Sequence, residues 1–264
     1  MNSYTCNLCN NSKTKKFTEN SVLCLECNSL FAISSVSNFP GITSNNTLKM
    51  KSQKKISKIV ASSYFEYLKS KSKISFKNSL DIGAGFGDFV ELLSKNGVDS
   101  YGIEYDDLTF KHSNSRIINK LFDTSFPEDK KYDLISINQS IYYFENTITI
   151  LKKISSLLNK NGKILISTIN PESKFRLENK IWTQGCNMCP SKKIYENLQN
   201  INLNLLDITG YDDQIYMKFF LHRKKEISTW NFWKNNLTFL TNLKDVITLN
   251  PNGINYFILL EKTE

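Results

Sequence analysis

The fold of this chain is decided by the stretch Leu80-Asp81-Ile82-Gly83-Ala84-Gly85-Phe86-Gly87-Asp88. It starts as an apolar strand and continues as a turn with glycine at every second position. Such a turn lets the backbone approach a bound nucleotide where any side chain would collide. About 20 residues further on, an acid at a second strand's tip can accept hydrogen bonds from ribose hydroxyls. That acid is Glu104, in Gly102-Ile103-Glu104-Tyr105-Asp106. The pair of segments predicts a cofactor that contains adenosine.

The spacing of the glycines favours S-adenosylmethionine over a dinucleotide. A dinucleotide site reads G-x-G-x-x-G and places a pyrophosphate at a helix N-terminus, whereas here glycines alternate at 83, 85 and 87. Asp81, just before them, would repel a pyrophosphate but suits a sulfonium and an amino group. Asp81-x-Gly-x-Gly-x-Gly followed by Glu104 resembles the class I S-adenosylmethionine-dependent methyltransferases.

The segments that follow keep to the same pattern. Residues 131–138 form an apolar run of strand length, 147–158 carry apolar residues at helical spacing, and 163–168 form another strand. Asn161-Gly162 is a typical stop signal for the helix between them. Strands that alternate with helices predict an α/β fold with a doubly wound, Rossmann-like parallel sheet. The resemblance to the methyltransferases is good over residues 76–170 and loose elsewhere.

Further elements complete this expected methyltransferase domain, which we place at residues 52–264. Helices are predicted from Ser52 and over 88–95, and strands over 101–104, 117–121, 203–209 and 256–260. The last two strands pair antiparallel at the sheet edge in the family that the chain resembles. Between them, residues 210–252 form an insertion rich in aromatic residues. It is either a lid that closes over a substrate or a cap whose aromatic side chains pack into the core.

The cysteines predict a metal site ahead of this domain. Cys6, Cys9, Cys24 and Cys27 form two C-x-x-C pairs separated by 14 residues, a spacing typical of zinc ribbons. Two such turns supply the four thiolates of a tetrahedral, structural zinc site. The alternatives are structural thiols and redox disulfides. We therefore expect a zinc-ribbon module over residues 1–33, followed by a linker over 34–51 that is rich in Ser, Asn and Thr.

A third pair, Cys186 and Cys189, has no partner pair and cannot complete a tetrahedral site alone. Three interpretations stay open: a loop beside the substrate pocket, a half-site shared between subunits, or plain structure. Ser191 is expected to cap a helix over 192–198, and Trp182 to contribute to a substrate wall.

The resemblance also implies roles for individual residues in cofactor binding. The three loop glycines would line the methionine portion, with Asp81 near its amino group and Asn138 at the methionine end. Glu104 would bind the ribose and Tyr105 would lie against the adenine. Asp123 would accept a hydrogen bond from the adenine amino group.

The catalytic candidates are Tyr142 and Tyr143, which stand where many small-molecule methyltransferases carry a Glu-His pair. A tyrosine acts as a base only with a lowered pKa; otherwise it stacks on the substrate or packs structurally. The Asp/Asn-Pro-Pro-aromatic motif of nucleobase amino methyltransferases is absent, which argues against exocyclic base methylation.

Composition narrows the function only slightly. The formal net charge is +9, but the lysines are spread along the whole chain. The chain has neither an apolar run of 18 residues nor a signal sequence, so we expect a cytoplasmic protein that does not span a membrane. A zinc ribbon ahead of this domain resembles methyltransferases of sugars, glycans or secondary metabolites, which favours a small-molecule substrate. The alternatives are a ribosomal-RNA methyltransferase, which the basic charge would suit, and a non-enzymatic module.

Overall fold

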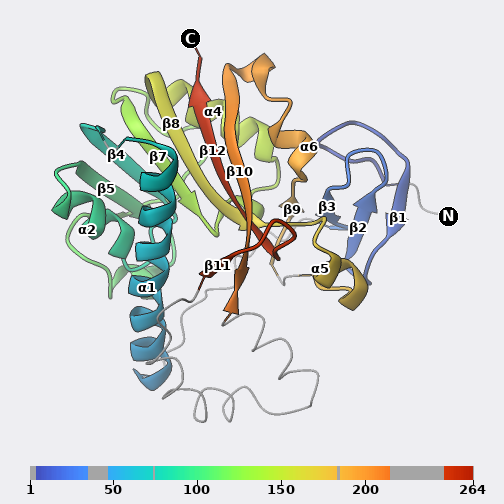
Figure 1. Cartoon of the computed structure of the whole chain (residues 1–264), viewed down its shortest axis with the longest axis horizontal. Coiled ribbons are helices and arrows are strands. Elements are labelled where there is room, and N and C mark those ends of the chain that lie inside the picture. The colour runs from blue at the N-terminus through green and yellow to red at the C-terminus, as the bar shows by residue number, and fades with distance from the viewer. Residues whose placement is uncertain (1–3, 35–46, 74, 183–184, 215–246, 264) are drawn as a thin grey trace.

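The computed structural model describes residues 4–34, 47–73, 75–182, 185–214 and 247–263 (Figure 1). Two sheets organise these residues: a four-stranded sheet built mainly from the N-terminal segment and an eight-stranded sheet that runs through the rest. Within the described segments, no helix combines the length and the apolar character needed to cross a membrane.

The large sheet has the strand order β11-β10-β12-β8-β7-β4-β5-β6. The strands from β6 to β8 are parallel, whereas β12 runs antiparallel between β8 and β10. The chain leaves β4 toward β5 and β6 and then returns to the other side of β4 to form β7. Such a switch in direction opens a crevice at the carboxyl ends of the strands. The strands are β4 (Asn78–Ile82), β5 (Asp99–Glu104), β6 (Ile117–Asn119), β7 (Tyr132–Asn138), β8 (Leu158–Ile169), β10 (Leu203–Asp213), β11 (Ile247–Leu249) and β12 (Asn255–Lys262).

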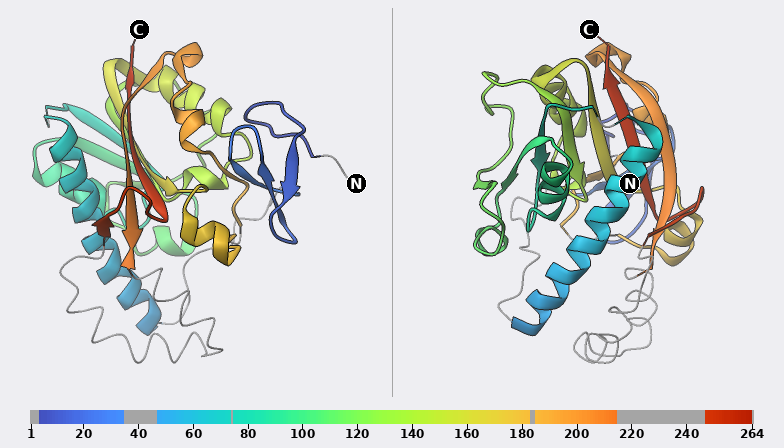
Figure 2. Two further views of the ribbon diagram at one scale, coloured as in Figure 1. Left: turned by 45° about the vertical axis from the view of Figure 1, so that its right-hand side comes forward. Right: turned by 60° about the vertical axis from the view of Figure 1, so that its left-hand side comes forward.

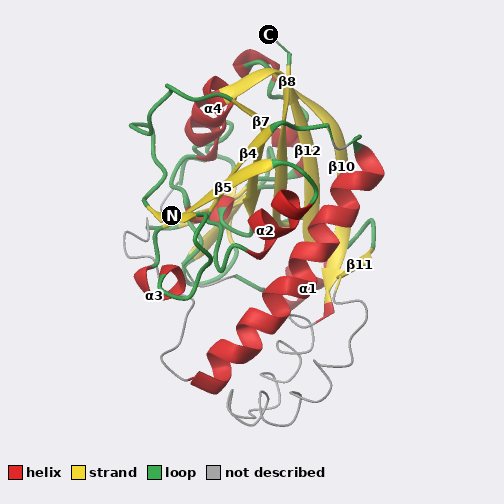
Figure 3. Cartoon of the chain, turned by 90° about the vertical axis from the view of Figure 1, so that its left-hand side faces the viewer, coloured by secondary structure: helices red, strands yellow, loops and turns green. Residues whose placement is uncertain are grey.

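Helices cover both faces of this sheet, which confirms the doubly wound α/β fold (Figures 2 and 3). One face carries α1 (Thr47–Lys71) and α2 (Asp88–Lys95), and the other carries α4 (Thr147–Leu157). The remaining helices are short: α3 (Asp107–Phe110), η1 (Ile141–Tyr143), α5 (Lys174–Asn179), α6 (Lys192–Tyr195) and η2 (Gln199–Ile201).

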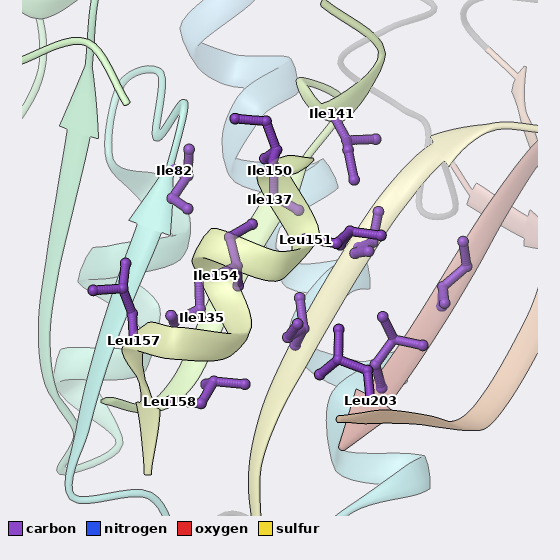
Figure 4. Close-up of a cluster of buried hydrophobic side chains, with 14 of the residues drawn as sticks. Ile82, Ile135, Ile137, Ile141, Ile150, Leu151, Ile154, Leu157, Leu158 and Leu203 are labelled. Carbon is purple, nitrogen blue, oxygen red and sulfur yellow. The ribbon is translucent and has the colours of Figure 1, made fainter. Parts of the chain in front are cut away.

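Apolar side chains on the central strands alternate between the two faces of the sheet, which explains why helices cover both faces. On β7, Leu134 packs in the cluster that contains α1 residues, whereas Ile135 and Ile137 pack in the cluster beneath α4. Figure 4 shows Ile150 and Ile154 of α4 in that second cluster. Each such fully buried Leu or Ile contributes roughly 1.5–3 kcal/mol of transfer free energy. The continuous apolar runs of the parallel strands therefore require a helical layer on each side.

The small sheet joins two distant parts of the chain. Its strands β1 (Thr14–Lys16), β2 (Ser21–Cys24) and β3 (Leu30–Ala32) come from the N-terminal segment, which we call the ribbon (residues 4–34). The fourth strand, β9 (Met188–Cys189), belongs to the segment after β8 and pairs antiparallel with β3. The ribbon therefore lies against the side of the large domain (Figure 1).

Some elements differ in extent from the sequence expectation. Helix α1 begins at Thr47, inside the segment expected to be a linker, and not at Ser52. Helix α4 ends at Leu157 and β8 starts at the next residue, so Asn161-Gly162 lies inside the strand. Residues 215–246, which make up much of the aromatic insertion, lie outside the described residues. The expectation of either a lid or a cap falls on these residues. Tyr211 of that insertion is buried in β10.

Candidate active site

The glycine turn at the end of β4 folds back onto β5. Backbone N–H groups of Gly83 and Ala84 donate to the Ile103 carbonyl at 3.0 and 2.9 Å. Gly83 and Gly85 have φ of 71° and 58°, a region that side chains disfavour. A Cβ built on Gly83 would stand 2.8 Å from Ser140 Oγ, whereas one on Gly85 would meet nothing within 4 Å and point into open space. The turn thus leaves a cradle at Gly85 that a ligand can enter.

Glu104 holds this turn in place. Its Oε2 accepts the Gly85 N–H and its Oε1 accepts the Asp106 N–H, both at 2.8 Å. Burial raises the pKa of Glu104, and these backbone bonds oppose the shift. A carboxylate has about four acceptor sites, so Glu104 can accept ribose hydroxyls in addition.

Asp81 and Asn138 lie deeper, at the ends of β4 and β7. Asp81 is 3% exposed and accepts a hydrogen bond from Ser136 Oγ at 2.6 Å. Burial raises its pKa to about 7; the Ser136 bond opposes this and the charge of Glu104 adds to it. The amide of Asn138 is also buried, and its interaction with the Asp81 carboxyl opposes the rise of the Asp81 pKa. A buried carboxyl and a buried amide therefore meet at these two strand ends, and this edge fits a polar cofactor.

A cavity of about 440 Å³ opens at these strand ends. It brings together Gly83, Glu104, Tyr105, Asp123 and Tyr143 among the expected site residues. Tyr105 is 57% exposed at the rim. Asp123 Oδ1 accepts the N–H and the hydroxyl of Ser125 at 2.8 and 2.6 Å, and the hydroxyl bond is the main cause that lowers the Asp123 pKa. Asp123 is therefore an ionised acceptor at the cavity edge.

The two tyrosines differ in position. Tyr142 is buried and its hydroxyl donates to Gln139 Oε1 at 3.3 Å, whereas Tyr143 lines the cavity. Burial raises the pKa of Tyr142 well above its usual range and that of Tyr143 to about 12. A tyrosine base requires a shift in the opposite direction. Neither phenol is therefore suited to take a proton at neutral pH.

Further residues line the cavity or support its lining. Ser140 lines the cavity, and its hydroxyl donates to the Ile82 carbonyl at 3.0 Å. Beside it, Gln139 has a φ of 53° and donates to Ser167 Oγ and the Tyr211 hydroxyl at 2.9 and 2.7 Å. Both follow directly on Asn138, and that position after a strand end is the sequence signal for them; of the two, Ser140 lines the cavity. Phe144 also lines it, as do Lys120, Leu121, Phe122, Glu145, Gly185 and Asn187, for which the sequence indicated no role.

The ribbon brings its four cysteines together. The sulfur atoms of Cys6, Cys9, Cys24 and Cys27 all lie within 4.8 Å of one another, with Cys6–Cys27 and Cys9–Cys24 separations of 3.7 and 3.5 Å. A tetrahedral site with Zn–S bonds of about 2.3 Å needs sulfur atoms about 3.8 Å apart. The donor set and its spacing therefore fit zinc.

Cys186 and Cys189 lie outside this group. Both are buried, in a cluster with Phe17, Leu30 and Tyr142. Ser191 occupies the position before α6, but its side chain makes no capping bond and donates to the Cys27 carbonyl of the ribbon. The expectation of a side-chain cap was wrong because the Ser191 hydroxyl bonds to the ribbon and not to the backbone of α6.

Comparisons with known proteins agree with this geometry. A family model described as a methyltransferase domain matches residues 45–208. Among curated proteins, none matches the chain in sequence.

Solved structures share the fold at low sequence identity. A SAM-dependent methyltransferase from Archaeoglobus fulgidus superposes with a TM-score of 0.55 and 16% identity over 82% of this chain and 100% of that one. A possible histamine N-methyltransferase from Thermotoga maritima has a TM-score of 0.54 and 11% sequence identity, and the match covers 83% of this chain and 96% of that one. Magnesium protoporphyrin IX methyltransferase from Synechocystis, with bound SAH, has a TM-score of 0.52 and 11% sequence identity, and the match covers 84% of this chain and 90% of that one.

Proposed function

The chain belongs to the methyltransferase-domain family and is an S-adenosylmethionine-dependent methyltransferase; from this premise we propose that it methylates a small molecule bound in the cavity at the strand ends. One observation carries this proposal: residues assigned to the cofactor, such as Glu104 and Tyr105, line the same cavity as the aromatic residues Tyr143 and Phe144. The volume of about 440 Å³ lies within the range of about 300–1,000 Å³ that is usual for small-molecule sites, and the cofactor occupies part of it. Structural neighbours named for histamine and for magnesium protoporphyrin IX support an acceptor of this class.

The cofactor roles follow from the contacts around the glycine turn. S-adenosylmethionine, when bound, supplies a methyl group made electrophilic by a positively charged sulfur. Asp81 offers a buried carboxyl to the cationic methionine portion, and the buried amide of Asn138 completes that end. Glu104 accepts the ribose hydroxyls while it keeps the turn folded. Tyr105 covers the adenine and Asp123 accepts from its amino group.

The chemical contribution of the protein is then orientation and exclusion of water. Methyl transfer is an in-line displacement, which gains most from holding the two reactants in alignment. Tyr143 and Phe144 form one wall of the cavity. Since burial keeps the Tyr143 hydroxyl neutral, we assign it a packing and orienting role in place of the base role considered from the sequence.

We also propose that the ribbon binds one structural zinc ion through Cys6, Cys9, Cys24 and Cys27. Their mutual spacing supports this assignment. Four thiolates fill the coordination sphere of zinc and leave no position for a substrate. The metal would therefore stabilise the ribbon, whose own core is small.

One experiment tests the acceptor class. The purified protein is incubated with methyl-labelled S-adenosylmethionine and a lysate separated into RNA, protein and small-molecule pools, with the Glu104→Ala variant as the inactive control. We expect label in the small-molecule pool that depends on Glu104. Label confined to RNA, and lost on ribonuclease treatment, would contradict the proposal and favour an RNA acceptor.

A further inference from the structure

The segment between β8 and α6 links the ribbon to the active-site cavity. Its strand β9 pairs with β3, where Leu30 faces Cys189 and Phe31 faces Met188. The pairing continues by one residue, because the Ala32 N–H donates to the Asn187 carbonyl at 2.9 Å. Asn187 and Gly185, in the same segment, line the cavity. Part of the cavity wall thus belongs to the segment that leads into the strand added to the ribbon.

Asn187 also bonds to η1, through its backbone N–H and its side-chain Nδ2. Its backbone N–H donates to the Tyr142 carbonyl at 2.8 Å, and its side-chain Nδ2 donates to the Tyr143 carbonyl at 2.7 Å. Both carbonyls belong to η1, the turn that follows β7 and carries Tyr143 into the cavity. Asn187 is only 7% exposed, so water competes poorly for these bonds.

The opposite end of the segment is fixed to a cysteine turn. Ser191 donates its hydroxyl to the Cys27 carbonyl, and its N–H donates to Ser29 Oγ at 3.0 Å. Both serines are fully buried. Met188 packs among Cys6, Cys24 and Cys27 in one cluster. A continuous set of contacts therefore runs from the cysteine turn through β9 and Asn187 to η1.

We propose that Asn187 is a positioning residue that holds η1 against the ribbon, so that the ribbon builds the acceptor side of the catalytic cavity. This inference rests on the proposed function, because it assigns a role to the cavity wall in that site. It makes the ribbon part of the catalytic unit instead of a separate binding module. It also predicts that removal of metal from the ribbon loosens η1, although no cysteine of the four-cysteine group lines the cavity.

The test is hydrogen exchange of the full chain, followed by mass spectrometry of peptides that cover residues 139–146. The amides of Tyr143 and Phe144 are bonded within η1, at 3.1 and 3.3 Å from their acceptors, and report its opening. Loss of the Nδ2 bond in Asn187→Ala should speed their exchange about fivefold or more. Peptides over 99–104 in β5 should not change. Asn197→Ala is the matched control, since Asn197 Nδ2 donates to the Lys193 carbonyl in α6, away from η1.

A second variant separates hydrogen bonding from packing. Asn187→Asp keeps the size of the side chain but presents a carboxylate to the Tyr143 carbonyl. Its protonated form can donate, and burial favours that form, so the protection of η1 relative to the wild-type protein at the same pH should return as the pH falls from about 8.5 to about 5. The wild-type protein treated with a zinc chelator should show faster exchange in 139–146 and not in 99–104.

Unchanged exchange of 139–146 in both Asn187 variants would overturn the proposal, as would equal acceleration in 99–104. Failure of the proposed function would show differently. In that case the methyl label would enter RNA and not the small-molecule pool, whatever the exchange of η1.

Discussion

Glu104 accepts the backbone N–H of Gly85 at 2.8 Å, so the acid that ends β5 fixes the glycine turn that ends β4. The two halves of the sequence fingerprint are therefore one structural unit. We expect Glu104→Ala to weaken S-adenosylhomocysteine binding by ~1–3 kcal/mol, the cost of lost charge-assisted hydrogen bonds. Calorimetry measures this, with Glu91→Ala as the control, because Glu91 pairs with the exposed Lys95 on α2 and does not line the cavity. Equal affinities for wild type and Glu104→Ala would remove Glu104 from the site.

Substitution by alanine should affect cofactor affinity at Gly85 and thermal stability at Gly102. A Cβ on Gly85 meets only the open cradle, whereas one on Gly102 would stand 2.5 Å from the Ala84 Cβ. We expect Gly85→Ala to lose cofactor affinity at a stability cost of about 1–2 kcal/mol from its left-handed backbone. Gly102→Ala should instead lower the melting temperature strongly. Thermal denaturation together with calorimetry distinguishes the two, and a Gly85→Ala variant that binds normally would show that the cradle is not the cofactor site.

Asp81 should make the stability of the cofactor-free protein depend on pH. The unfolded chain releases this proton near the ordinary value of 3.8, while burial raises the folded-state pKa to about 7. Between these values the folded state binds more protons, so this group lowers the free energy of unfolding as the pH rises, by a few kcal/mol in all at about 1.4 kcal/mol per unit. Asp81→Asn removes the effect. As the pH rises from about 4 to about 8, the melting temperature of the wild type should fall increasingly below that of Asp81→Asn. Parallel curves of melting temperature against pH would argue against a protonated Asp81.

The four-cysteine group should hold the metal without help from the third pair. Cys9→Ser should reduce bound zinc well below one ion per chain, since three thiolates bind less tightly than four. Cys189→Ser is the control, because Cys189 is equally a C-x-x-C cysteine but lies outside the group. Metal content by atomic absorption measures both variants. Zinc lost from Cys189→Ser and retained in Cys9→Ser would reverse the assignment.

Tyr143 should act through its ring and not its hydroxyl. With a pKa raised by burial to about 12, the phenol stays protonated through the neutral range. Methyl-label transfer by Tyr143→Phe should therefore keep the pH profile of the wild type, while Tyr143→Ala, which opens the cavity wall, should lose most of its activity. The disappearance of a basic limb in Tyr143→Phe would restore the hydroxyl as a base.

The parts of the fold that the sequence predicted are those set by local pattern. The glycine turn, Glu104 and the buried strands depend on residue types at fixed spacing, and each lies where it was expected. The four ribbon cysteines converge for the same reason. Local signals were weaker at element ends, where tertiary packing decides the boundary, as at the start of α1.

The contacts between the ribbon and the cavity could not be read from the sequence. Asn187 lies inside a C-x-x-C pair whose cysteines drew attention to metal, whereas its role comes from pairing with a strand far away in the chain. Ser191 matches a helix cap by type but bonds to Cys27 across the interface. Long-range pairing of this kind leaves no periodic signal in a single sequence.

The most direct test of the account is a calorimetric titration of the wild-type protein with S-adenosylhomocysteine, beside a parallel titration with NAD. The alternating glycines, the buried Asp81 and the buried amide of Asn138 suit a cationic sulfonium cofactor and its product, and they disfavour a pyrophosphate. We predict saturable binding of S-adenosylhomocysteine to one site per chain and no measurable binding of NAD. Binding of NAD in place of S-adenosylhomocysteine would contradict the account.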